Sequence, residues 1–248
     1  MKKSFILAAA GAMLFGGVAF AQEKSTMFNG STNLQAFYDF GRECITSTLE
    51  GFYNDPWGNT FFFIDYDYQL TSDNGTTDSP GSTYFEIARC FNFWQNSALG
   101  AFSLQLEYNG GFGTWDTPTE CGFYNVNHAI LAGVDYFIHS ADFSNTLNLK
   151  VLYKNFTNMA QDVPMQFTAV WGLQDLFGAK GLRYSGFVDV WWEGSNCVVL
   201  SEPQLWYAVG QHFGCPNLNI GGEIELSANF AGTEGFACRP CAGLKWVF

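Results

Sequence analysis

Residues 102–108 read FSLQLEY, and residues 147–151 read LNLKV. In both stretches every second residue is apolar and the residues between are polar. Successive side chains of a β-strand point to opposite faces, so each stretch predicts a strand with one apolar and one polar wall. The three-to-four-residue spacing of an amphipathic helix is missing. These stretches indicate an all-β chain.

The same alternation recurs along the chain, in segments that are rich in β-forming residues. We expect strands at residues 33–41, 43–55, 59–70, 82–93, 98–112, 127–139, 146–156, 164–175, 182–194, 199–210, 218–230 and 241–248. Most of these segments reach the roughly 9–11 residues that a tilted membrane-crossing strand needs. Their even number suits closure. The fold class that we predict is a transmembrane antiparallel up-and-down β-barrel of about 12 strands.

The alternation fits two arrangements, because a soluble sandwich or lipocalin-like barrel would hide the apolar wall inside. The composition favours a membrane barrel, since only 14% of the residues are charged and 18% are aromatic. Connection lengths point the same way. The expected connections 56–58, 94–97, 140–145, 176–181 and 211–217 are short, whereas 71–81 and 113–126 are longer. Short turns at one end and longer loops at the other are typical of outer-membrane barrels.

One residue departs from the pattern. Arg89 falls on the apolar face, between Ile87 and Phe91. A bulge, a position at the membrane interface or a different register would explain it.

The first residues predict export. Lys2 and Lys3 precede an apolar stretch at 5–20, and residues 19–21 (AFA) form a cleavage site of small residues. We expect a signal peptide at 1–21, cleaved after Ala21, and one barrel domain at 22–248. Together with the barrel pattern, this predicts the outer membrane of a Gram-negative bacterium, with its lipid as a partner. After residue 22 no apolar run is long enough for a membrane-spanning helix.

Charge and motifs exclude several functions. The formal net charge of −12 argues against binding of a nucleic-acid polymer. Neither G-x-S-x-G nor H-E-x-x-H occurs, so we expect no enzyme, no catalytic residue, no cofactor and no metal. The pair Cys238 and Cys241 has C-x-x-C spacing but no helix or second pair to support a redox or zinc role. Loop disulfides or inert thiols are the expected states of the seven cysteines.

If the apolar walls face outward, the polar walls line a lumen. Its expected acidic residues are Asp39, Glu50, Asp65, Asp67, Glu86, Glu107, Asp135, Asp189, Glu193, Glu202, Glu223 and Glu225, and its bases are Lys150, Lys154, Arg183 and Lys245. The inward aromatics are Phe37, Phe61, Phe63, Phe137, Phe187, Trp191 and Trp206. Such a lumen can filter solutes by size and charge, or the charges can simply pair with one another. The aromatic rings can stack on a base, or simply fill the lumen.

The chain resembles the Tsx-like nucleoside-specific channel-forming proteins of outer membranes, and more closely a poorly characterised relative of them. The resemblance is carried by residues 33–40 (NLQAFYDF), 48–52 (TLEGF), 55–58 (DPWG) with 61–66 (FFFIDY), 84–89 (YFEIAR), 171–172 (WG) and 246–248 (WVF). It implies a monomeric twelve-stranded barrel with a narrow pore. It also implies nucleoside sites made of aromatic and ionisable residues.

We therefore predict a channel for passive uptake of nucleosides or similar small polar solutes. Its predicted substrate-binding residues are Glu50, Phe61, Phe63, Asp65, Glu86, Glu107, Asp189 and Trp191. Two alternatives stay open. One is a structural or surface barrel that transports nothing, and the other is a soluble periplasmic barrel that binds a small ligand.

Overall fold

The computed structural model describes residues 29–69, 80–116 and 119–248. The predicted signal peptide and its cleavage after Ala21 lie outside the described residues, as does most of the expected loop 71–81. No helix in the described part of the chain is long and apolar enough to cross a membrane.

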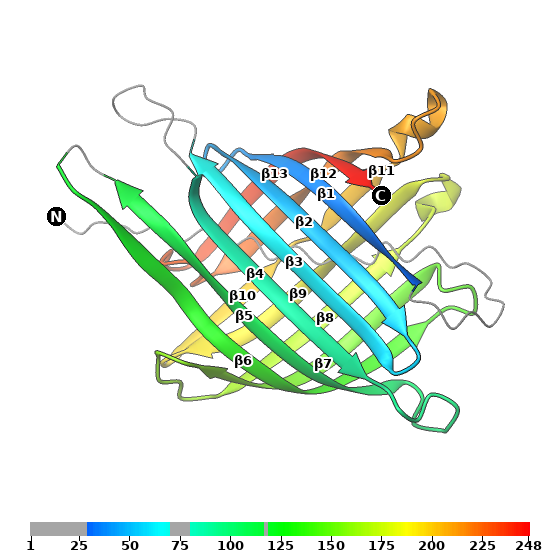
Figure 1. The fold of residues 1–248 in the computed structure, drawn as a ribbon, viewed down its shortest axis with the longest axis horizontal. Helices are drawn as coiled ribbons and strands as arrows, with labels where there is room; N and C mark the ends of the chain where they lie inside the picture. Colours follow the sequence, from blue (N-terminus) through cyan, green and yellow to red (C-terminus); the bar gives the residue numbers. More distant parts are fainter. Residues whose placement is uncertain (1–28, 70–79, 117–118) are drawn as a thin grey trace.

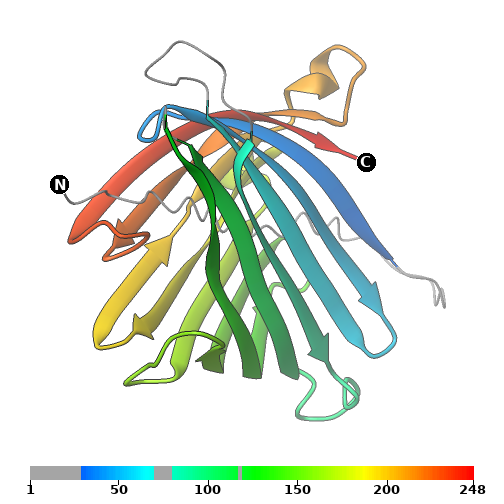
Figure 2. The same ribbon diagram turned by 60° about the vertical axis from the view of Figure 1, so that its left-hand side comes forward.

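The strands form one closed antiparallel sheet, tilted around a common axis (Figures 1 and 2). In chain order they are β1 (Asn29–Asp39), β2 (Cys44–Asp55), β3 (Gly58–Gln69), β4 (Pro80–Phe91), β5 (Phe102–Asp116), β6 (Cys121–His139), β7 (Asn145–Phe156), β8 (Met165–Leu173), β9 (Leu182–Glu193), β10 (Asn196–Ser201), β11 (Gln204–Tyr207), β12 (Leu218–Ala228) and β13 (Phe236–Val247). Two short 3-10 helices, η1 (Leu176–Gly178) and η2 (Val209–His212), lie in connections.

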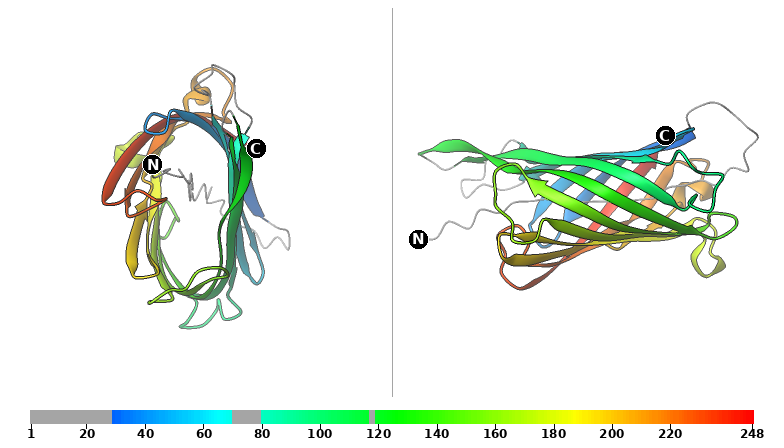
Figure 3. Two further views of the ribbon diagram at one scale, coloured as in Figure 1. Left: turned by 90° about the vertical axis from the view of Figure 1, so that its left-hand side faces the viewer. Right: turned by 90° about the horizontal axis from the view of Figure 1, so that it is seen from below.

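Pairing of β1 with β13 closes the sheet, and the ring is oval when viewed end-on (Figure 3). Strands β10 and β11 both pair with β9 on one side and with β12 on the other. They therefore share one wall position, and the thirteen segments make twelve positions. This confirms the predicted twelve-stranded antiparallel barrel.

The apolar side chains face outward. Ile64, Leu104 and Leu149 are 43%, 49% and 43% exposed, whereas the neighbouring Gln105 is 1% exposed. A soluble barrel would need the reverse arrangement, because large contiguous apolar surfaces are rare on soluble monomers. An apolar exterior around a polar interior is typical of a barrel that sits in a bilayer.

The expected difference in loop lengths is wrong for the described connections. Residues 92–101 join β4 to β5 and residues 208–217 join β11 to β12, although both connections were expected to be short. The expected loop 113–126 is mostly strand, because β5 continues to Asp116 and β6 begins at Cys121. Turn-forming residues misled the prediction. Gly113 fits the extended hairpin because the ring of Tyr124 lies against its backbone.

One predicted strand is interrupted, and one charged residue lies on the outer face. The predicted strand 199–210 is interrupted after Ser201, because Pro203 has no N–H to give to a ladder. Arg89 lies on the outer face without a bulge, beside the β2–β3 turn, where its guanidinium donates to both carboxylate oxygens of Asp55 at 2.6 and 2.9 Å. A position near the rim of the barrel therefore explains the exception.

Candidate solute site in the barrel lumen

All eight predicted site residues face the lumen. They are distributed over β2 (Glu50), β3 (Phe61, Phe63, Asp65), β4 (Glu86), β5 (Glu107) and β9 (Asp189, Trp191). The structure brings them together in two adjoining places, and side chains from β4 and β5 meet those from β9 across the lumen. Their role in binding a solute stays a prediction.

The first place is a row that runs straight across three strands. Phe63 is the register partner of Glu50 on β2 and of Glu86 on β4. Its ring is fully buried, and a carboxylate stands on each side of it. Asn33 donates to Glu50 at 2.7 Å, and Tyr84 and Asn109 donate to Glu86 at 2.7 and 2.9 Å. Neighbouring side chains therefore hold both carboxylates in place.

The second place surrounds Lys154 on β7. Its ammonium group interacts electrostatically with Asp189, Glu86 and Glu107 and donates to Gln166 at 2.7 Å. It also lies 4.4 Å from the centre of the Trp191 ring. This lysine thus binds the Trp191 ring by a cation–π contact, which covers one face of the ring.

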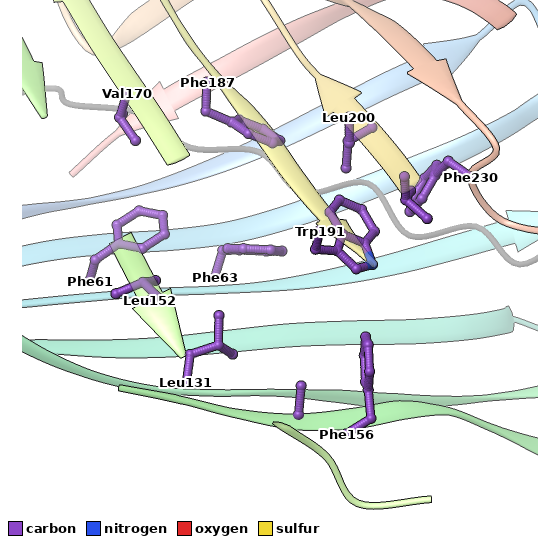
Figure 4. Packing of buried hydrophobic residues seen from close by; sticks show 12 residues of the cluster. Phe61, Phe63, Leu131, Leu152, Phe156, Val170, Phe187, Trp191, Leu200 and Phe230 are labelled. Carbon is purple, nitrogen blue, oxygen red and sulfur yellow. The ribbon is translucent and has the colours of Figure 1, made fainter. Parts of the chain in front are cut away.

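An apolar cluster occupies the lumen beside these charges. Phe61 and Phe63 from β3 belong to the same buried cluster as Leu131, Phe187 and Trp191 from β6 and β9 (Figure 4). The remaining members come from β6, β7, β8, β10 and the β12–β13 connection: Ala129, Leu152, Phe156, Val170, Val198, Leu200 and Phe230. Inward aromatic residues were expected here, but the aliphatic ones beside them were not. Together they form an apolar section of the lumen, which narrows any path along the barrel.

A third group of charges lies near the β1–β2 turn. Arg42 donates to Asp39 at 2.6 Å and to Glu225 on β12, and Glu225 also accepts from Arg239 on β13. Burial acts to lower the pKa of Arg42, but the charges and hydrogen bonds of Glu225 and Asp39 outweigh it and raise that pKa. Arg42 therefore stays a cation, and these carboxylates are neutralised within the protein.

Sequence reasoning placed Phe37 and Trp206 in the lumen but missed that they form a pair. Their ring centres are 5.5 Å apart, and the Lys245 ammonium is 4.3 Å from the Trp206 ring. The two rings lie over Gly221 and Gly243, where a β-carbon would come within 2.8 Å of Trp206 and 2.7 Å of Phe37. Inward-facing glycines in two adjacent strands were the available signal.

The cysteines show no paired chemistry in the described residues, where all seven are free thiols. Cys238 and Cys241 are three residues apart on β13, so their side chains point to opposite faces of the wall. Within the described ranges, no group of three His, Cys, Asp or Glu side chains is arranged to hold a metal ion.

Comparison with known proteins gives a family but no function. The family described as Domain of unknown function (DUF5020) matches residues 31–248. No curated protein matches the chain. The Tsx-like resemblance thus stays a prediction.

Among solved structures, a mutant of the Rhodopseudomonas blastica porin is similar at 11% identity and a TM-score of 0.36, over 90% of this chain and all of that one. The outer membrane protein OpdK of Pseudomonas aeruginosa is similar at 7% identity and a TM-score of 0.39, over 89% of this chain and 98% of that one. At these scores the architecture rests on the strand pairing, not on the likeness.

Proposed function

We propose the following function for this chain, which belongs to the DUF5020 family: it is an outer-membrane channel that passes small polar solutes. The observation that carries the proposal is the orientation of the closed wall. Its apolar side chains face out, toward lipid, and its acidic and amide side chains face in. A hole lined with polar groups lowers the cost of moving a hydrated solute through the hydrocarbon layer.

Nucleosides are the solutes that we propose first. A nucleoside offers a flat base, which stacks on aromatic rings, and ribose hydroxyls, which donate to carboxylates. The row Glu50–Phe63–Glu86 supplies both kinds of partner, an aromatic ring and a carboxylate on each neighbouring strand. Trp191 is a weaker candidate because Lys154 already covers its ring.

Planar bilayers test the channel and the solute together. We expect the purified protein to give discrete conductance steps that adenosine or uridine blocks, while ribose at the same concentration does not. Stacking on an aromatic ring is worth roughly 1–3 kcal/mol, so Phe63→Ala is expected to weaken the block by about fivefold or more. Phe62→Ala is the matched control, because Phe62 lies next to it on the outer face, stacked on Tyr53. Conductance that nucleosides do not block would support the channel proposal and contradict nucleosides as its solutes.

The apolar cluster favours a second candidate, a structural or surface barrel that transports nothing. Side chains from β3 and from β6–β10 meet in one buried cluster and can close the path. Swelling of liposomes in sugar solution separates the two functions. Vesicles that contain the protein should swell in an isotonic monosaccharide if the channel is open, and they should behave like protein-free vesicles if the cluster seals it.

A further inference from the structure

The wall of the barrel has a break at Glu202 and Pro203, between β10 and β11. The backbone there still forms hydrogen bonds with both neighbouring strands, β9 and β12. The Glu202 N–H donates to the Phe187 carbonyl at 3.2 Å, and the Pro203 carbonyl accepts from the Ile224 N–H at 3.0 Å. The break therefore fixes the Glu202 backbone within the wall while removing it from the regular ladder.

The Glu202 side chain is buried without a partner. It is 1% exposed, and neither of its carboxylate oxygens has a hydrogen bond with any residue that the structure describes. A buried carboxylate with no partner is costly in free energy, so such groups are normally paired with a cation. Glu202 is thus an unused acceptor with two free oxygens.

The charges around Glu202 do not supply that cation. Its strongest electrostatic neighbours are three carboxylates, Glu223, Glu225 and Asp65, and one cation, Arg42. The guanidinium of Arg42 is already bonded to Asp39 and Glu225. An excess of negative charge is left beside Glu202.

Two of these carboxylates add acceptor oxygens to the same region of the lumen. Asp65 on β3 accepts from Thr48 at 2.5 Å with one oxygen, and its second oxygen is buried with no hydrogen-bond partner within the described ranges. Glu223 on β12 accepts from Gln204 at 2.8 Å, and it interacts electrostatically with Asp65, with Glu202 and with the buried ammonium of Lys245 on β13. Three carboxylates thus face one region of the lumen from three parts of the wall.

We propose that Glu202, Asp65 and Glu223 form a binding site for the ammonium or guanidinium group of a small organic cation that enters the lumen. The three side chains are not arranged to hold a metal ion, as noted above for the described ranges. An organic cation is larger and carries several N–H donors, which match several separated carboxylate oxygens. This inference rests on the proposed channel function, and it adds small organic cations to the nucleosides as a second class of solute.

The test uses putrescine as the probe in planar bilayers. Two compounds of the same chain length serve as solute controls: 1,4-butanediol, which is uncharged, and succinate, which is negatively charged. We expect putrescine to reduce the single-channel current and both controls to leave it unchanged. Glu202→Gln should weaken the putrescine block by at least tenfold, whereas Glu234→Gln in the β12–β13 connection should not change it.

Asp65→Asn gives an independent second variant, because its amide oxygen can still accept the Thr48 hydrogen bond. It should weaken the block in the same direction, and heat-modified mobility on gels shows that each variant is folded. If putrescine blocks the folded variants and the wild type equally, the proposed cation site is overturned, but the proposed channel function is not. If the wild type does not conduct, the channel proposal fails, and binding of putrescine to the detergent-solubilised protein decides the site: binding that Glu202→Gln abolishes supports it, and no binding overturns it.

Discussion

Glu225 on β12 connects the last two strands of the barrel to the β1–β2 turn. It accepts from Arg42, from Arg239 and from Ser227, and its side chain is 3% exposed. Two guanidinium groups therefore share one carboxylate. Removing the charge of that carboxylate leaves two buried cations with less compensation, which is more costly than losing an exposed ion pair.

Glu225→Gln should lower the free energy of unfolding by about 3 kcal/mol, the low end of the cost of breaking a buried pair, because Asp39 still neutralises Arg42. Urea unfolding of the protein in lipid vesicles, followed by tryptophan fluorescence, measures the loss. Glu234→Gln removes the same charge from an exposed connection and should stay within about 0.5 kcal/mol of the wild type. An equal effect of the two substitutions would show that the two arginines do not depend on Glu225.

At the scale of the strand, alternation carried most of the predictive power. A period of two is a local property, so each of the twelve segments was recognised without any knowledge of its neighbours. The interruption at Pro203 and the continuation of β5 through Gly113 were missed, since both depend on what the adjacent strand offers the backbone. Boundaries at the ends of β4 and β5 were misjudged for the same reason.

The centre of β7 offers a direct test of the outer face. Val151 is 49% exposed, and its register partners Val134 and Phe167 are exposed as well. In a bilayer this position lies in hydrocarbon, so Val151→Arg should lower the free energy of unfolding by about 2–4 kcal/mol. Phe213→Arg, in the connection between β11 and β12, is the matched control and should cost about 0–1 kcal/mol. Urea titration in vesicles compares the two, and a neutral effect at Val151 would place β7 in water.

At the scale of the whole molecule, the sequence predicted the wall but not the arrangement of groups inside it. The inward parity of Phe63, Glu202 and Trp206 could be read from the strands that hold them. Which inward groups meet could not, because such contacts join residues that are far apart in the chain. The bond from Arg42 to Glu225 spans 183 residues. The closed ring brings these residues together, and only its register decides which charges pair and which are left free.

The same closed ring makes a prediction about contact with lipid that needs no knowledge of the solute. We expect p-benzoylphenylalanine in place of Leu104 or Leu149 to cross-link to lipid acyl chains on irradiation, since both positions lie on the exposed outer face. The same photoreactive residue in place of Gln105 or Asn148 should not, because these neighbours point into the barrel and are 1% and 5% exposed. Mass spectrometry of the irradiated protein in vesicles detects the lipid adduct. Adducts at the inward pair, or at all four positions alike, would contradict the orientation. Adducts at the outward pair alone would place the apolar wall in the membrane and leave the polar wall free to line a path for solutes.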